Sequence, residues 1–208
     1  MAEGITAVGF VSTSHVVLQV IAIIEGLHEA GLFPTIVYNT NGYERPETIK
    51  KVEGSIDVYL PDFKYINPIL AKKYSDAPDY PEYAAKSIKE MYRQKGSTLF
   101  INEDGQAESG MLIRHLILPG HSGDSIDLLQ YLASEISTGI HISLMSQYYP
   151  VDKAICHPVL NRGLYYDEYQ CVVDEMHRLG FRNGWIQEMD SHSYFRPDFK
   201  KEEPFSPL

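Results

Sequence analysis

The stretch Ile56 to Tyr65, IDVYLPDFKY, places two opposite charges directly after a short apolar segment. The segment 56–60 has the composition of a buried strand, and Asp62 and Lys64 follow it with one residue between them. Side chains alternate between two faces of an extended chain, so Asp62 and Lys64 share one face and Phe63 lies on the other. A solvated ion pair in a loop explains the pair. Taken alone, the pair fits that explanation slightly better than a ligand site at the carboxyl end of a strand, but the repetition of the arrangement along the chain favours the ligand site.

Polar side chains of related kinds follow several other apolar segments. The candidates for a site at these strand ends are Ser12, Thr13, Asn39, Thr40, Asp62, Lys64, Arg114, Gln147 and Tyr148. Arg114 lies inside the apolar segment 111–118 and needs a partner if it is buried, whereas His115 belongs to the opposite face. A guanidinium group can hold a carboxylate through two hydrogen bonds. If the strand ends converge, the set suits an amino-acid-like ligand better than a polyphosphate.

Other site classes have weaker support in the sequence. There is no GxGxxG or Walker motif, so a dinucleotide or ATP site is not indicated. His115, His121 and Asp124 form the best metal-ligand trio, but their spacing matches no known zinc motif, and we predict no metal site. Cys156 and Cys171 are not at metal-ligand spacing and are expected to be buried thiols of a cytoplasmic protein.

Length and charge limit the class of protein. The chain has 208 residues, 44% of them hydrophobic, which is sufficient for one domain with a sizeable core. A net charge of −10 without a Lys/Arg cluster argues against nucleic-acid and anionic-membrane partners. The apolar run 16–24 contains Gln19 and is too short to span a bilayer. No secretory signal is recognisable, so we expect a cytoplasmic protein.

The apolar segments that position these residues alternate with amphipathic ones. We predict strands over 5–11, 34–38, 56–60, 111–118, 140–145 and 183–187, helices over 15–30, 46–52, 67–73, 82–95, 124–136 and 166–179, and a β-hairpin over 97–110. This alternation predicts a parallel sheet with right-handed crossovers. Six units cannot close an eightfold barrel, so an open, partial (β/α) barrel over 4–187 is favoured, and a doubly wound flat sheet is the alternative. Residues 188–208 are expected to form a polar tail.

Several strand-end segments also form an ordered set: YNTNGYE, DVYLPDFKY, KYSDAPDY, EMYRQ, LIRHLILPG, SQYYP and NGWIQ. Together they resemble the radical S-adenosylmethionine superfamily, in the branch of uncharacterised relatives of pyruvate formate-lyase activating enzymes. The resemblance implies a partial (β/α)6 TIM-like barrel whose first strand leads into a CxxxCxxC loop. In that family the loop holds a [4Fe-4S] cluster, which reductively cleaves S-adenosylmethionine to a 5′-deoxyadenosyl radical.

The chain departs from this family pattern at the cluster. It contains no CxxxCxxC, and its sequence aligns from the family's second strand onward, with FVSTSH at the position of a glycine-rich motif. We therefore expect a barrel that lacks its first strand and holds no cluster ligands. Eight residues stand at positions that contact S-adenosylmethionine by this resemblance: Ser12, Thr13, Asn39, Thr40, Asp62, Lys64, Arg114 and Gln147.

Three functions remain open at this point. The first is the S-adenosylmethionine-binding portion of a radical enzyme, with the cluster segment missing or supplied by another chain and a protein as a conceivable substrate. The second is a non-catalytic binding module whose exposed first strand pairs with another chain or with a second copy. The third is a Schiff-base lyase that uses Lys64 as its amine and Asp62 as a proton-transfer partner.

Overall fold

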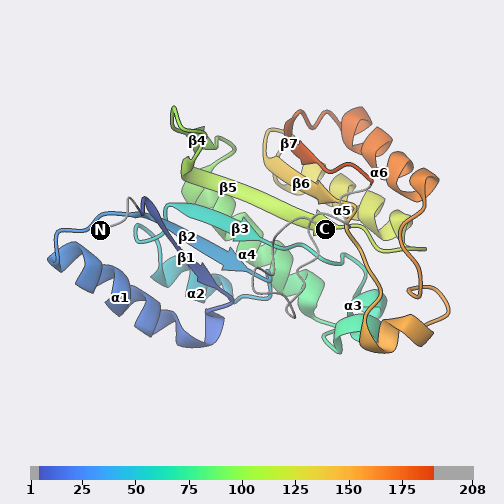
Figure 1. Cartoon of the computed structure of the whole chain (residues 1–208), viewed down its shortest axis with the longest axis horizontal. Helices are drawn as coiled ribbons and strands as arrows, with labels where there is room; N and C mark the ends of the chain where they lie inside the picture. The colour runs from blue at the N-terminus through green and yellow to red at the C-terminus, as the bar shows by residue number, and fades with distance from the viewer. Residues whose placement is uncertain (1–4, 190–208) are drawn as a thin grey trace, which may run out of the picture.

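The computed structural model describes residues 5–189, which form one open sheet covered by helices (Figure 1). Six parallel strands follow one another in the order of the sequence: β1 (Ala7–Val11), β2 (Thr35–Thr40), β3 (Val58–Pro61), β5 (Ala107–Leu116), β6 (His141–Met145) and β7 (Asn183–Ile186). The seventh strand, β4 (Phe100–Ile101), pairs antiparallel with β5. The expected domain 4–187 falls almost wholly within the described residues, whereas most of the expected tail 188–208 lies outside them.

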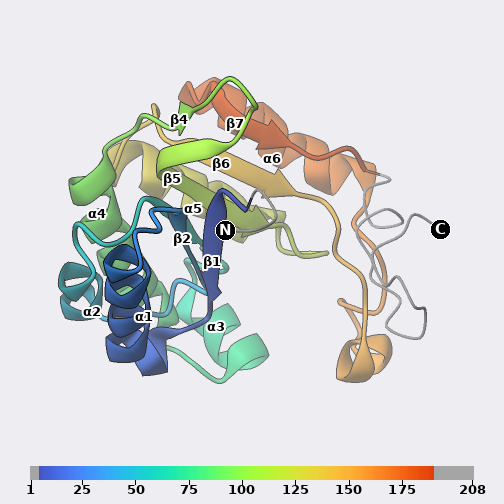
Figure 2. The ribbon, with the colours of Figure 1, turned by 60° about the vertical axis from the view of Figure 1, so that its left-hand side comes forward.

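The strand order decides between the two predicted architectures. A doubly wound sheet reverses its order at a switch point, and this sheet does not. With right-handed crossovers, an unreversed order places every connecting helix on the same face. Figure 2 shows the result, a curved sheet with helices on its convex side. The fold is therefore an open sheet of the barrel type, and the doubly wound alternative is wrong.

Six helices cover the convex face: α1 (Val17–Glu29), α2 (Pro46–Lys51), α3 (Pro68–Ser75), α4 (Tyr80–Lys95), α5 (Ser122–Glu135) and α6 (Tyr166–Leu179). Two 3-10 turns, η1 (Ser14–Val16) and η2 (Asp152–Cys156), lie in the connections that precede α1 and α6. Proline occupies the first turn of α2, α3 and α4, where its missing N–H costs nothing. No helix within residues 5–189 is both long enough and apolar enough to cross a membrane.

The core lies between the convex face and the helices. Along β6, Ile142 and Leu144 are fully buried against the helices, while His141, Ser143 and Met145 on the other face are only partly buried. The same alternation runs through β2. In a closed eight-stranded barrel the inner face would be filled by packed side chains. Here the inner face stays accessible and can carry polar side chains.

The carboxyl ends of β2, β3 and β5 are held together by backbone contacts. The Asp62 N–H donates to the Thr40 carbonyl at 2.8 Å, and the Phe63 N–H donates to the Arg114 carbonyl at 2.9 Å. Gly42 turns the chain after β2 with a φ of +80°, and a Cβ atom there would lie 2.1 Å from the Asp62 carbonyl oxygen. The turn after β2 therefore presses directly on the peptide that carries Asp62.

We expect Gly42→Ala to destabilise the protein more than Gly54→Ala. Both glycines have nearly the same φ, +80° and +81°, but a Cβ at Gly54 meets nothing within 4 Å. A left-handed backbone conformation alone costs about 1–2 kcal/mol for alanine. Overpacking adds a further ~1–3 kcal/mol at Gly42. Unfolding both variants in urea measures the difference, and equal losses of stability would show that the close approach to Asp62 is not required.

Candidate functional site

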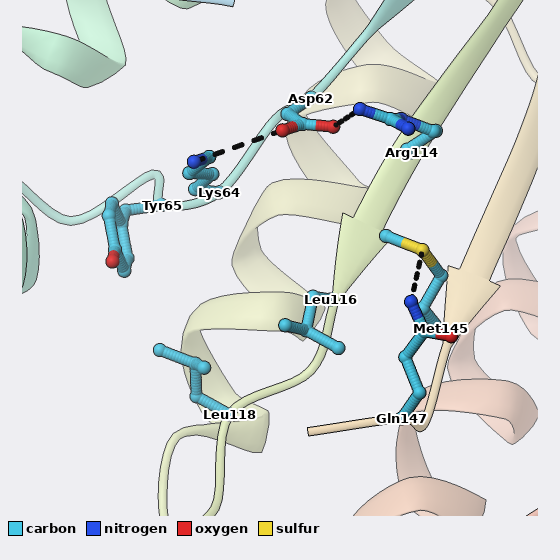
Figure 3. A pocket seen from close by; sticks show the side chains of 8 residues that line it. All are labelled: Asp62, Lys64, Tyr65, Arg114, Leu116, Leu118, Met145 and Gln147. Carbon is cyan, nitrogen blue, oxygen red and sulfur yellow. Dashed lines mark hydrogen bonds and ion pairs between the residues drawn. The ribbon is translucent and has the colours of Figure 1, made fainter. Parts of the chain in front are cut away.

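Three charged side chains meet where β3 and β5 end. Arg114 Nη2 lies 2.6 Å from Asp62 Oδ1, and Lys64 Nζ lies 3.8 Å from Asp62 Oδ2. Arg114 Nη2 also donates to Asn39 Oδ1 at 2.8 Å, which brings in the end of β2. Figure 3 shows Asp62 between the two cations. One carboxylate thus serves two cations, and the cluster keeps an excess of positive charge.

Two atoms of this cluster retain unused hydrogen-bonding capacity. Asp62 Oδ1 and Arg114 Nε are buried and have no hydrogen-bond partner among residues 5–189. The 2.6 Å contact between Asp62 Oδ1 and Arg114 Nη2 is therefore an ion pair without the angles of a hydrogen bond. Buried polar atoms in native proteins nearly always have a protein or water partner. These two atoms are consequently the part of the cluster whose hydrogen-bonding capacity the described residues leave unused.

A cavity of about 330 Å³ adjoins the cluster. It is lined by Asp62, Lys64, Tyr65, Arg114, Leu116, Leu118, Met145 and Gln147. Figure 3 shows the charged side chains at one end and the leucines, Met145 and Gln147 at the other. Its volume is at the lower end of the range for small-molecule sites. The lining suits a ligand that has a charged end and an apolar part.

The hydroxyl of Tyr80 fixes the backbone that carries the charges. It accepts the Lys64 N–H at 2.9 Å and lies 3.0 Å and 3.1 Å from the carbonyl oxygens of Asn41 and Asp62. Burial raises the pKa of Tyr80 far above its usual value, so the phenol keeps its proton and can donate it to one of these carbonyls. Phe63 between the two charges is fully buried, as strand alternation predicted. Helix α4 therefore positions both charged residues that follow β3.

His115 supports the same segment from the helix side. Its Nδ1 lies 2.7 Å from the Phe63 carbonyl oxygen and its Nε2 lies 2.8 Å from Ser125 Oγ. A carbonyl can only accept, so Nδ1 carries the proton and Nε2 accepts the hydroxyl of Ser125. His115 is 1% exposed, and burial lowers its pKa to about 4. A neutral imidazole thus links the peptide between Asp62 and Lys64 to helix α5.

The metal-ligand trio does not form. Both nitrogens of His115 are engaged, His121 Nε2 lies 2.7 Å from the hydroxyl of Tyr74, and Asp124 accepts the backbone N–H of Asn67 at 2.8 Å. Residues 5–189 contain no group of three or more His, Cys, Asp or Glu side chains that could hold a metal ion.

The other predicted residues do not belong to the charged cluster. Gln147 lines the cavity and is close to Gln187, whose Nε2 donates to Gln147 Oε1 at 3.2 Å. Ser12 adopts a φ of +52°, and its N–H donates to the Asn39 carbonyl at 2.8 Å. The hydroxyl of Thr13 is buried without a partner among the described residues. Neither Ser12 nor Thr13 lines the cavity. The structure therefore places them beside the site, at the end of the first strand.

Thr40 and Tyr148 also lie outside the cavity lining. Thr40 is buried, and its hydroxyl donates to Glu44 Oε1 at 2.6 Å. Tyr148 donates to the Leu160 carbonyl at 2.9 Å, so it organises the connection after β6. Both residues use their hydroxyl groups within the protein.

Sequence reasoning missed the role of Glu44. This carboxylate is 3% exposed, and its Oε1 accepts hydroxyl groups from Ser14 at 2.6 Å, Thr40 at 2.6 Å and Tyr38 at 3.2 Å. Burial, and next the charge of Glu44, raise the pKa of Tyr38. Glu44 joins η1, which precedes α1, to the end of β2. The sequence around Glu44 does not reveal this role, because its three hydrogen-bond donors come from positions 14, 38 and 40 on two segments.

The apolar wall of the cavity was also missed, although a signal for it existed. Leu116 continues the alternation that placed Arg114 on the inner face of β5, and Leu118 extends the same spacing beyond the strand. Met145 precedes the predicted polar segment after β6 by one residue and lines the cavity beside them. The period of two residues that identified the charges therefore also identifies their apolar neighbours.

Comparison with known proteins gives a structural neighbour and one distant curated relative. A domain of pyruvate-formate lyase-activating enzyme from Bacteroides vulgatus has a TM-score of 0.59 and 17% sequence identity, and the match covers 87% of this chain and 98% of that domain. An uncharacterized protein of Methanocaldococcus jannaschii is 26% identical over 140 residues, which cover 67% of this chain and 37% of that protein. No family model matches the chain. The structural match confirms, at the level of the fold, the resemblance that the strand-end segments predicted.

We expect the burial of neutral His115 to make stability depend on pH. The pKa of His115 is about 4 in the folded chain and 6.5 in the unfolded chain. As the pH falls, the imidazole is therefore protonated first in the unfolded chain, and this favours unfolding. Neutral His115 therefore contributes its full stabilisation above pH 6.5, and this contribution is lost as the pH falls towards 4. At pH 4.5 we expect the free energy of unfolding to be lower by about 2 kcal/mol.

The measurement is the free energy of unfolding in urea at pH 7 and pH 4.5. His115→Gln should show a smaller difference between the two pH values than the parent chain. His28→Gln, at an exposed position, is the matched control and should behave as the parent. An unchanged pH dependence in His115→Gln would contradict the assignment.

Proposed function

We propose that the chain binds S-adenosylmethionine at the carboxyl ends of its strands, as the binding portion of a protein related to the radical activating enzymes. The observation that carries the proposal is the Asp62–Lys64–Arg114 cluster beside a cavity with an apolar wall. The fold that the chain shares with a domain of pyruvate-formate lyase-activating enzyme supports it.

The charged cluster fits the amino-acid end of such a ligand. The side chain of Lys64 is 44% exposed and has only a 3.8 Å contact with Asp62, so it is free to turn towards a ligand carboxylate. Asp62 can accept the ligand ammonium group through Oδ2, since Oδ1 is buried against Arg114. Arg114 is bound to Asp62 and Asn39, and its side chain, 31% exposed, lines the cavity, where it can meet a ligand carboxylate. The apolar wall then receives the uncharged part of the ligand.

The iron–sulfur cluster of the family does not fit the residues of this chain that the structure describes. Cys156 and Cys171 are both exposed, which corrects the expectation of buried thiols, and they belong to η2 and α6. A [4Fe-4S] cluster needs several thiolates gathered in one place. The proposal for this chain is therefore ligand binding, and any cluster thiolates come from other residues or another chain.

The Schiff-base alternative finds little support in the surroundings of Lys64. Catalytic lysines of this kind are activated by desolvation or by a neighbouring cation. Lys64 is substantially exposed, and its closest charged neighbour is the carboxylate of Asp62. These surroundings favour a role in anion binding.

A non-catalytic module that associates with another chain is the second candidate. Among the described residues, β1 pairs only with β2, and Val11 at its end is 64% exposed. An unpaired strand edge is a template for strand addition. We propose this edge as the place where a second copy or a cluster-bearing chain would attach.

Calorimetric titration with S-adenosylmethionine tests the proposed binding. Without a cluster, a few charge-assisted hydrogen bonds offset only part of the cost of association, so we expect a dissociation constant no tighter than about 0.1 mM. Lys64→Met should weaken binding at least about tenfold. Lys86→Met, which removes an exposed lysine paired with Glu82, is the matched control and should leave binding unchanged.

Arg114→Ala should lower both affinity and melting temperature, because it also leaves Asp62 and Asn39 without their shared partner. Equal affinities for the parent and Lys64→Met would remove Lys64 from the site. A normally folded Arg114→Ala protein with unchanged affinity would remove Arg114.

We further expect the purified chain to bind no iron–sulfur cluster. Two exposed cysteines on separate elements cannot supply the thiolates of a [4Fe-4S] site. Anaerobic reconstitution, followed by iron and sulfide assays and the visible absorption spectrum, measures the outcome. Stoichiometric iron and sulfide on a monomer would contradict this expectation.

A further inference from the structure

A second cavity lies between the turn after β2 and the start of helix α4. It has a volume of about 260 Å³ and is lined by Tyr43, Glu44, Arg45, Asp79 and Tyr83. None of these residues lines the cavity beside the charged cluster, so the two cavities are separate. Tyr43, Glu44 and Asp79 come from the segments YNTNGYE and KYSDAPDY, and none of the three takes part in the proposed binding of S-adenosylmethionine.

Glu44 places a buried carboxylate at this cavity. It is 3% exposed, and glutamate is seldom so deeply buried without a cation beside it. No cationic side chain of the described residues forms an ion pair with it. Its Oε1 accepts all three hydroxyl groups that reach it, and its Oε2 makes no hydrogen bond within residues 5–189. Oε2 is not one of the fully enclosed atoms that lack a partner, so it is the oxygen in contact with the cavity.

Asp79 supplies a second carboxylate. It is the N-cap residue of α4, where an aspartate commonly accepts a backbone N–H of the first turn, yet its side chain makes no such bond. Its Oδ1 instead accepts the hydroxyl of Tyr43 at 2.6 Å, and this hydrogen bond raises the pKa of Tyr43. Its Oδ2 has no hydrogen bond to the described part of the chain. Glu44 and Asp79 therefore each leave one oxygen unpaired.

Two tyrosine rings form the rest of the wall. Tyr43 and Tyr83 meet edge to face, with ring centroids 5.7 Å apart and ring planes at 79°. Both rings line the cavity, and Tyr43 is 40% exposed. The faces of aromatic rings carry a negative potential that attracts cations. The carboxylates and the rings thus favour the same kind of ligand, one with a positive charge.

Arg45 limits the charge that such a ligand can have. Its side chain makes no ion pair or hydrogen bond within residues 5–189, although two carboxylates line the same cavity. Two carboxylates and one guanidinium leave a single negative charge uncompensated. A monovalent cation balances this charge, and N–H donors on it would satisfy the unpaired oxygens. The volume lies below the usual range of small-molecule sites, which restricts the ligand to a small group.

We propose that this cavity binds an alkylammonium group, that of a small primary amine or of a lysine side chain, between Glu44, Asp79 and the two tyrosine rings. A primary ammonium group has three N–H donors and one positive charge, so it can donate to Glu44 Oε2 and Asp79 Oδ2 together. A zwitterionic amino acid, which would use Arg45 for its carboxylate, is the competing occupant. The proposal does not rest on the proposed binding of S-adenosylmethionine.

Titration of the nitrogen-15-labelled chain with n-butylamine at pH 7 tests the proposal through its amide chemical shifts. We expect saturable shifts at residues 42–45 and 79–83, with a dissociation constant of about 1 mM. Tetramethylammonium has the charge without N–H donors and should bind at least about tenfold more weakly. n-Butanol, which has no charge, should leave these shifts unchanged. The absence of saturable shifts at these residues with butylamine would overturn the proposal.

Asp79→Asn should weaken butylamine binding at least about tenfold, because it replaces one charge-assisted hydrogen bond. Asp79 is exposed and its side chain does not cap α4, so we expect this variant to fold. Asp104→Asn removes the same charge from an exposed turn outside the cavity and is the matched control. Glu44→Gln should weaken binding similarly, and thermal melts establish whether it is folded. Equal binding by the parent and Asp79→Asn would refute the assignment.

Arg45→Gln distinguishes an amine from an amino acid. Without the guanidinium, a monovalent cation is no longer repelled, so butylamine should bind about threefold more tightly. Equal or weaker butylamine binding by this variant would contradict the charge balance on which the proposal rests. L-Leucine is the second probe. If it binds the parent more tightly than butylamine and loses this affinity in Arg45→Gln, the cavity binds amino acids and the proposal is wrong.

Two further comparisons identify the source of the ammonium group and separate the two cavities. Binding of Nα-acetyl-L-lysine methylamide as tight as that of butylamine would assign the cavity to lysine side chains, and exclusion of this capped lysine would assign it to small amines. Lys64→Met should leave butylamine binding unchanged, because Lys64 lines the other cavity. The same variant should weaken S-adenosylmethionine binding, so each proposal can fail without the other.

Discussion

The site depends on one carboxylate that is shared by two cations. Asp62 contacts Arg114 from β5 and Lys64 from its own strand, and Arg114 continues to Asn39 on β2. A half-buried arginine on an apolar strand is stabilised by such a partner. Asp62 therefore connects the segment after β3 to β5 and, through Arg114, to β2. The backbone around it is fixed by Tyr80 on one side and by His115 on the other. The strongest constraints in this half of the molecule thus converge on the few residues that would bind a ligand.

Much of this arrangement could be predicted from the sequence, because it follows from local periodicity. Alternation within each strand separated Asp62 and Lys64 from Phe63, and Arg114 from His115, and the structure buries Phe63 and His115 as expected. The contact of Arg114 with Asp62 shows that the strand ends converge. Strand and helix alternation predicted the parallel sheet. The hydroxyl contacts of Glu44 and Tyr80 could not be foreseen, because their partners come from segments whose approach is decided by packing. The exposure of both cysteines was also missed, since the default of burial reflects composition alone and not position.

The accessible inner face of the sheet explains why apolar and polar residues alternate along the strands. Parallel strands that are buried on both faces are nearly continuous in apolar residues. In this chain only the helix side of β6 is fully buried, and the other side carries His141, Ser143 and Met145. Polar side chains can therefore occupy the inner face of the sheet, from the charged cluster to His141, at little cost in stability. The distribution of polar groups over several strands follows from the sheet remaining open.

The free edges of the sheet also affect how it can move. Each parallel strand pairs with the next parallel strand along the chain, and within residues 5–189 no ladder joins β1 to β7. A closed barrel fixes its radius through the register of its ladders, whereas an open one keeps every hydrogen bond while its curvature changes. Small changes in twist between neighbouring strands add up across the sheet and alter the width of its opening. The molecule can thus adjust the separation between its two margins elastically, without unfolding any element.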